Sequence, residues 1–247
     1  MKLAVIVWVF VAIIIGSMAQ AQGGDASIFG RSNTYSVFLE YSNDSSHIIL
    51  GSAPNRKLAS LGFQYEHRLV SNHALIWRYA AEFRPLILES DPTGTDTLTI
   101  LSPPPTGVFP GQSQVAFQCV PGLFSFSSTV DGTLYSETQL IKCSRRWTYA
   151  QGFSPAGTRI NLMPHHRLQP TASLLVGEML STKKIPIDTA GSFNFTFEFG
   201  AGLEYYQSHS RSIRLEYQIH HFSNADTAQE NPGVDNGTFK LTYNLGR

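Results

Sequence analysis

The sequence has little of several features that define common protein classes. Only 15% of its 247 residues are charged, and 18 basic residues balance 18 acidic ones, so nothing favours nucleic acid as a partner. It has two cysteines, neither with a histidine nearby in the sequence, which fits no ordinary zinc site. The Gly-rich nucleotide-binding motifs and the G-x-S-x-G motif of many hydrolases are absent. We therefore expect no cofactor and no metal.

Long apolar runs are also missing, except at the N-terminus. There, Met1-Lys2 precedes "LAVIVWVFVAIIIG", and the small-residue segment "SMAQAQ" follows. This pattern predicts a signal peptide over residues 1–21, cleaved after Ala21. The alternative is an uncleaved anchor, but the run is short for a bilayer-spanning helix, which needs roughly 20 residues. We therefore expect an exported protein.

The two cysteines are Cys119 and Cys143. In an exported protein, such a pair is more often a disulfide than two free thiols. The sequence therefore predicts a bond between them.

Helical periodicity is lacking beyond residue 30, and segments that alternate apolar and polar residues take its place. These segments predict eight strands, at roughly 33–43, 57–69, 74–88, 147–162, 168–180, 192–206, 210–223 and 236–246. The connections after the second, fourth and sixth strands are tight. The others are longer, and the one after the third strand covers about 89–146.

This sorting of loop lengths is typical of an up-and-down barrel that crosses an outer membrane, with short periplasmic turns and long outer loops. We therefore predict an all-β fold: an eight-stranded antiparallel transmembrane β-barrel, forming one domain over 22–247, with one long extracellular loop. A soluble barrel with its apolar face inside is the alternative. The mixed acids and bases on the polar faces favour a lumen that pairs charges, and hence apolar side chains facing lipid.

Two polar residues break the lipid-facing pattern of the seventh strand, "SRSIRLEYQIHHFS". Ile213, Leu215 and Tyr217 share odd positions with His221 and Ser223, so the histidine and the serine are expected to point outward. Ionisable groups on that face are costly and indicate function. His220 is expected to point into the lumen.

A histidine and a serine two residues apart share a strand face, with Cα atoms roughly 6.5–7 Å apart. A histidine can take the proton of a serine nucleophile when an acid orients its ring. Asp235 is the favoured acid because it opens the neighbouring eighth strand with the same parity. Asp226 and Glu230 lie in the middle of the intervening loop and are less well placed.

The segments "HFSNA" and "NPGVD" resemble the lipid A 3-O-deacylase (PagL-type) family and its acyloxyacyl-hydrolase-like relatives. The resemblance implies an eight-stranded outer-membrane barrel with His221 as base and Ser223 as nucleophile. The family acid, a glutamate in the best-known members, falls on Asp235, which is one methylene shorter. Asn224, beside the nucleophile, is a candidate for holding an oxyanion through its side chain or its backbone amide.

The expected function is therefore an outer-membrane esterase that removes an ester-linked acyl chain from lipid A. The partners would be lipid A or lipopolysaccharide and the surrounding membrane lipids of a Gram-negative-type bacterium. The sequence leaves monomer and homodimer open. The alternative is a barrel without enzymatic activity, structural or adhesin-like, that binds through its long loops.

Overall fold

A computed structural model describes residues 28–246, and the predicted signal peptide lies outside them. The described chain forms ten strands: β1 (Asn33–Ser42), β2 (Lys57–Ser71), β3 (Leu75–Ser102), β4 (Gly107–Val115), β5 (Gly122–Val130), β6 (Thr133–Leu162), β7 (Leu168–Ser181), β8 (Phe193–Ser208), β9 (Arg211–Ser223) and β10 (Val234–Gly246). Among these residues, no helix is long and apolar enough to cross a membrane.

Eight of the strands close into a ring. Antiparallel hydrogen bonds run through β1, β2, β3, β6, β7, β8, β9 and β10, and the pairing of β10 with β1 closes the barrel. Each of the eight predicted strands corresponds to one strand of this ring, so the predicted all-β barrel is confirmed. Closure leaves the barrel without an open edge.

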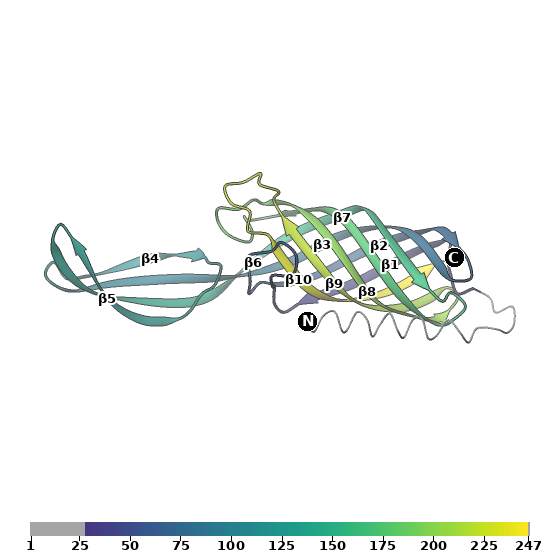
Figure 1. Cartoon of the computed structure of the whole chain (residues 1–247), viewed down its shortest axis with the longest axis horizontal. Coiled ribbons are helices and arrows are strands. Elements are labelled where there is room, and N and C mark those ends of the chain that lie inside the picture. The colour runs from purple at the N-terminus through teal and green to yellow at the C-terminus, as the bar shows by residue number, and fades with distance from the viewer. Residues whose placement is uncertain (1–27, 247) are drawn as a thin grey trace.

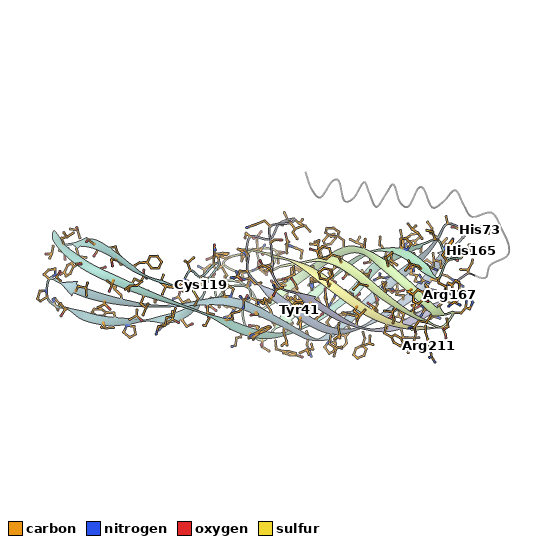
Figure 2. The ribbon with its side chains drawn as sticks, turned by 90° about the horizontal axis from the view of Figure 1, so that it is seen from below. Tyr41, His73, Cys119, His165, Arg167 and Arg211 are labelled. Carbon is orange, nitrogen blue, oxygen red and sulfur yellow. A yellow bond between two sulfur atoms is a disulfide. The ribbon has the colours of Figure 1, made fainter. Side chains whose placement is uncertain are left out.

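The two ends of the barrel differ as the loop lengths predicted. Short turns join β2 to β3, β6 to β7 and β8 to β9 at one end, and the longer connections lie at the other. In Figure 1 the longer connections face the part of the molecule that carries β4 and β5. Figure 2 places His73, His165, Arg167 and Arg211 at the short-turn end, far from Cys119.

Side chains sort onto the two faces of the wall as the alternation predicted. On β8, the odd-numbered residues from Phe193 to Tyr205 are exposed, while Asn194, Glu198 and Glu204 are buried in the lumen. On β9, Ile213, Leu215 and Tyr217 are exposed in the same way. The aromatic and aliphatic outer surface is that of a barrel that contacts lipid.

The lumen pairs charges of opposite sign, as a narrow, water-poor interior requires. Glu66 lies 2.9 Å from both Arg159 and Arg214. Arg84 pairs with Glu40 at 3.3 Å and with Glu82 at 2.8 Å. These residues are buried, so the polar interior is a connected network of ion pairs.

The segment expected as a long loop, 89–146, is instead mostly strand. β3 and β6 remain paired from Leu75↔Leu162 to Ser102↔Ser136, well past the last β2–β3 pair, Lys57↔Ser90. β4 adds to the free edge of β3 and β5 to that of β6, giving a four-stranded sheet of order β4-β3-β6-β5. We call this sheet the extension. It projects away from the barrel (Figure 1).

The alternation of apolar and polar residues predicts the strand only as far as residue 88, because the positions that face inward change near this point. The β3–β6 register shifts between Arg84 and Ile87, which moves the inward positions from even to odd numbers. Further along, both faces of the sheet are partly exposed, so no apolar face marks the strand. The predicted disulfide is present and joins Cys119 to Cys143 at the base of the extension, where Cys143 pairs with Gly94.

An apolar cluster closes the lumen at the end of the barrel that carries the longer connections. It gathers one residue from nearly every strand or connection there: Ala53, Leu58, Ile87, Ala150, Met179, Ile185, Phe222 and Val234. Phe222 and Val234 are opposite each other in the β9–β10 ladder. The adjacent residues on these two strands therefore have a firm support while facing outward.

Candidate active site

His221 and Asp235 lie directly opposite each other on β9 and β10. Opposed residues of an antiparallel pair share a face and have Cβ atoms about 5 Å apart. The ladder therefore brings the imidazole to the carboxylate, and His221 Nδ1 lies 2.6 Å from Asp235 Oδ1. The structure thus brings His221 and Asp235 together, whereas Asp226 and Glu230 lie exposed in the loop between the two strands.

This contact orients the imidazole ring. A carboxylate only accepts hydrogen bonds, so Nδ1 carries the proton toward Asp235. In the neutral ring the lone pair is then on Nε2, the nitrogen that can accept a proton from a nucleophile.

Ser223 is the last residue of β9, two residues beyond His221 and on the same face. It is half-buried and pairs with Phe195 of β8. Within the part of the chain that the structure describes, no hydrogen bond joins Ser223 to His221. The structure thus joins His221 to Asp235 and leaves the serine as their neighbour.

Both members of the His221–Asp235 pair are buried although they occupy outward positions. His221 is 8% exposed and Asp235 is fully buried. The cover is the β1–β2 connection, residues 43–56: Ser45 bridges to Asn236, and the backbone N–H of Ser46 donates to Asp235 O. The connection therefore extends along the start of β10 and shields the pair.

The covering segment also binds the second carboxylate oxygen. Asp235 Oδ2 accepts hydrogen bonds from the backbone N–H groups of Ile48 at 2.9 Å, Ile49 at 2.6 Å and Gly51 at 3.1 Å. We call these three donors the 48–51 nest. They stabilise the ionised acid in a place that excludes water. The sequence does not reveal the nest, although the pairing of the first and last strands in a closed barrel places the two segments together.

Asn224 begins the loop that returns to β10. Its backbone N–H donates to Asn231 Oδ1 at 3.0 Å, and its side-chain Nδ2 donates to Glu230 O at 2.8 Å. The backbone amide proposed for an oxyanion is therefore already used within the loop, and one side-chain N–H remains. The contacts that the structure gives Asn224 are those of a residue that shapes the loop.

His220 points into the lumen, as expected. It lies near Glu40 and Glu198, and these three residues form a group close enough to hold a metal ion. Arg84 pairs with both carboxylates, so a cationic side chain already lies between them. This group is on the opposite face of the wall from His221.

Comparison with known proteins finds a matching family model. The family model described as lipid A 3-O-deacylase (PagL) matches residues 124–244, a span that includes His221, Ser223 and Asp235. No curated protein matches.

Three solved structures are similar to this chain. The outer membrane enzyme PagL is 11% identical, with 86% of this chain and 99% of that one covered and a TM-score of 0.49. Neisserial surface protein A is 8% identical, with coverages of 87% and 97% and a TM-score of 0.45. The outer membrane protein OprG from Pseudomonas aeruginosa is 10% identical, with coverages of 90% and 100% and a TM-score of 0.38. The assignment rests on the family model: residues 124–244, close to half of the chain, match the lipid A 3-O-deacylase (PagL) family of ester hydrolases.

Proposed function

We propose that this protein is an outer-membrane esterase that removes an ester-linked acyl chain from lipid A with Ser223, His221 and Asp235. One observation carries the proposal above all others. The His221–Asp235 pair, with its 2.6 Å contact, lies on the outer wall of the barrel, and a serine on the same face is two residues from His221.

The exposed apolar wall supports a place in the membrane. With the short turns in the periplasm, β9 runs outward and ends at Ser223. Its end then lies near the boundary between acyl chains and head groups of the outer leaflet, where the ester bonds of lipid A are found. The substrate can thus reach the serine without leaving the bilayer.

The first half of the reaction transfers the acyl group to the enzyme. His221 Nε2 takes the proton of the Ser223 hydroxyl as Oγ forms a bond to the ester carbonyl carbon. The tetrahedral intermediate then collapses, the bond from carbon to the sugar oxygen breaks, and the imidazolium returns its proton to that oxygen. Asp235 holds the ring in the required tautomer and stabilises its positive charge.

The second half frees the enzyme. His221 takes a proton from a water molecule as the water oxygen attacks the acyl-enzyme carbonyl. Collapse of this intermediate releases the fatty acid, and Ser223 Oγ recovers the proton. The step consumes one water and regenerates the starting state, so the residues of this chain account for every proton.

The neighbouring strand offers a surface for the acyl chain. Phe195 is opposite Ser223 and Phe197 is opposite His221 on β8, and both rings are exposed. A fatty acyl chain lying along these rings would have its carbonyl next to the serine.

The direct test is Ser223→Ala, assayed by mass spectrometry of lipid A. We expect deacylation to fall by roughly 10³-fold or more, because the nucleophile is lost. The barrel should still shift its electrophoretic mobility on heating. Ser210→Ala, in a short turn at the opposite end, is the matched control and should deacylate normally. Deacylation retained by folded Ser223→Ala would refute the mechanism.

A barrel without enzymatic activity is less well supported, because the chain matches a family of hydrolases. An unchanged lipid A acylation pattern in cells with and without the wild-type protein would revive that alternative.

A further inference from the structure

Asp235 is the acid of the proposed triad of Ser223, His221 and Asp235. Both of its carboxylate oxygens have hydrogen-bond partners, although its side chain lies on the outer wall. Asp235 Oδ1 binds His221, and Oδ2 binds the three backbone donors of the 48–51 nest. Backbone donors differ from side chains because a rotamer change cannot remove them. The carboxylate is thus fixed by a segment about 185 residues away in sequence, as the 184-residue separation of Gly51 and Asp235 shows.

The nest approaches so closely that it leaves no space for a larger residue. A Cβ atom added to Gly51 would lie 2.6 Å from Asp235 N and 2.9 Å from Asp235 Cγ, both closer than such contacts normally come. Gly233, with φ +58°, is similar: a Cβ there would lie 3.2 Å from His221 Cε1. Glycine at position 51 is therefore what allows the donors to reach a short acid.

The covering segment is held in place by its own contacts. Arg56 is buried and donates to four carbonyls, those of Pro54, Ala116, Phe117 and Pro186. Its backbone N–H donates to Ser45 Oγ, which in turn donates to Ala53 O. Two anchors thus fix the ends of the segment, so the nest exists before substrate binds.

We propose that the 48–51 nest is the positioning element for the catalytic acid and makes this site selective for aspartate over glutamate at position 235. The inference rests on the proposed function and deepens it. A glutamate is longer by about 1.5 Å, one carbon–carbon bond. Its carboxylate would meet the backbone of the nest before it reached His221 in the orientation seen here.

Few other charges are near the pair, so changes in the nest should act through Asp235. The outward residues of β8 beside the site are the phenylalanines 193, 195, 197 and 199. On the covering segment, His47 is the one titratable residue between 45 and 53, and it is exposed. The loop 224–233 adds Asp226 and Glu230, which are also exposed.

The test compares Gly51→Ala, Asp235→Glu and their combination in the full-length barrel, assayed on lipid A in detergent micelles. Each single variant should lower kcat by about tenfold or more, with KM little changed, because a misplaced acid misorients the base. In the combination, the displaced segment leaves room for the longer acid. We therefore expect it to be more active than Gly51→Ala alone, a non-additive result that shows direct coupling.

Leu50→Ala is the matched control. Leu50 is in the same segment, its side chain is 76% exposed, and its N–H is not one of the three donors. This variant should keep the wild-type kcat. Heat-modifiable mobility establishes that each barrel is folded, and Asp235→Glu provides the test if Gly51→Ala does not fold.

A second measurement separates positioning from general damage. A carboxylate displaced by Gly51→Ala lengthens its hydrogen bond to His221 Nδ1, so the NMR signal of the Nδ1 proton should move upfield as that bond weakens. We expect this upfield shift when Gly51→Ala is added to Ser223→Ala, and no shift when Leu50→Ala is added.

These readouts distinguish the two proposals. If Ser223→Ala stays active while Gly51→Ala still moves the signal of the His221 Nδ1 proton, the proposed mechanism fails and the positioning role of the nest stands. Wild-type kcat and an unchanged signal of the His221 Nδ1 proton in folded Gly51→Ala, or full activity in Asp235→Glu, would overturn the positioning role of the nest.

Discussion

At the scale of single residues, the site combines a local pattern with a distant contact. His221 and Ser223 share a face because side chains alternate along a strand. Asp235 meets His221 because the β9–β10 register puts them opposite each other. The second oxygen of this carboxylate accepts hydrogen bonds from backbone N–H groups of the β1–β2 connection. None of these residue types is unusual by itself. Their combination on a lipid-facing wall indicates a functional site.

Asp235→Asn tests the negative charge with almost no change of shape. An amide presents N–H hydrogens either to the nest or to His221 Nδ1, and the charge that stabilises an imidazolium is gone. We expect kcat to fall by roughly 10²-fold or more, measured as acyl-chain release from lipid A. Asp226→Asn, at an exposed loop position, is the control and should retain normal activity. Equal activities of the two variants would exclude Asp235 as the acid.

At the scale of elements, the barrel strands and the extension have separate supports. The barrel closes through β10 and β1, whereas the extension is held by the β3–β6 pairing and the strands added to its edges. The Cys119–Cys143 bond ties the β4–β5 connection to β6. Arg56 also contacts that connection, through the carbonyls of Ala116 and Phe117.

Replacing both cysteines by serine should therefore weaken the extension more than the barrel. The bond has a sequence separation of 24 residues, and a loop of this size is worth about 3 kcal/mol on the loop-entropy model. We expect faster proteolysis within 93–146, with heat-modifiable mobility and deacylation preserved. Loss of the heat shift in the double variant would show that the barrel depends on the bond.

At the scale of the whole molecule, the protein reverses the usual placement of polar and apolar side chains. Its outer wall is aromatic and aliphatic, and its interior is an ion-pair network under an apolar cluster. Lipid solvates the outside, so the inside must satisfy its own charges. Because the outer wall is otherwise apolar, the covered histidine–aspartate pair on it is an exception, and it indicates a functional site.

Arg214→Met probes this network. Arg214 contacts Glu66 at 2.9 Å and Glu216 at 3.0 Å, and its loss leaves buried carboxylates without one of their cations. Breaking such a pair typically costs about 3–5 kcal/mol, so the temperature of the heat-modifiability transition should fall markedly. Leu241→Ala, on the outer face of β10 at 50% exposure, should shift it far less. A larger shift for Leu241→Ala would contradict the assignment of inside and outside.

The sequence by itself determined the barrel, its eight strands and the outward direction of His221 and Ser223. These follow from a two-residue period and from the sorting of loop lengths, both of which are local properties that a chain displays without folding. The disulfide was also predictable, because an exported protein meets an oxidising environment. The pairing of Asp235 with His221 was predictable because the last two strands are neighbours.

Only the tertiary structure decided the rest. The 48–51 nest is invisible in the sequence because backbone N–H groups have no residue signature, and their direction depends on how the closed ring folds its first connection over its last strand. The strands of the extension could not be predicted because a register shift after Arg84 reverses the inward positions, and from Gly94 on, both faces are partly exposed. The loop contacts of Asn224 likewise arise only once residues 224 and 231 meet. Contacts between distant segments carry no local pattern, and they are what completes this site.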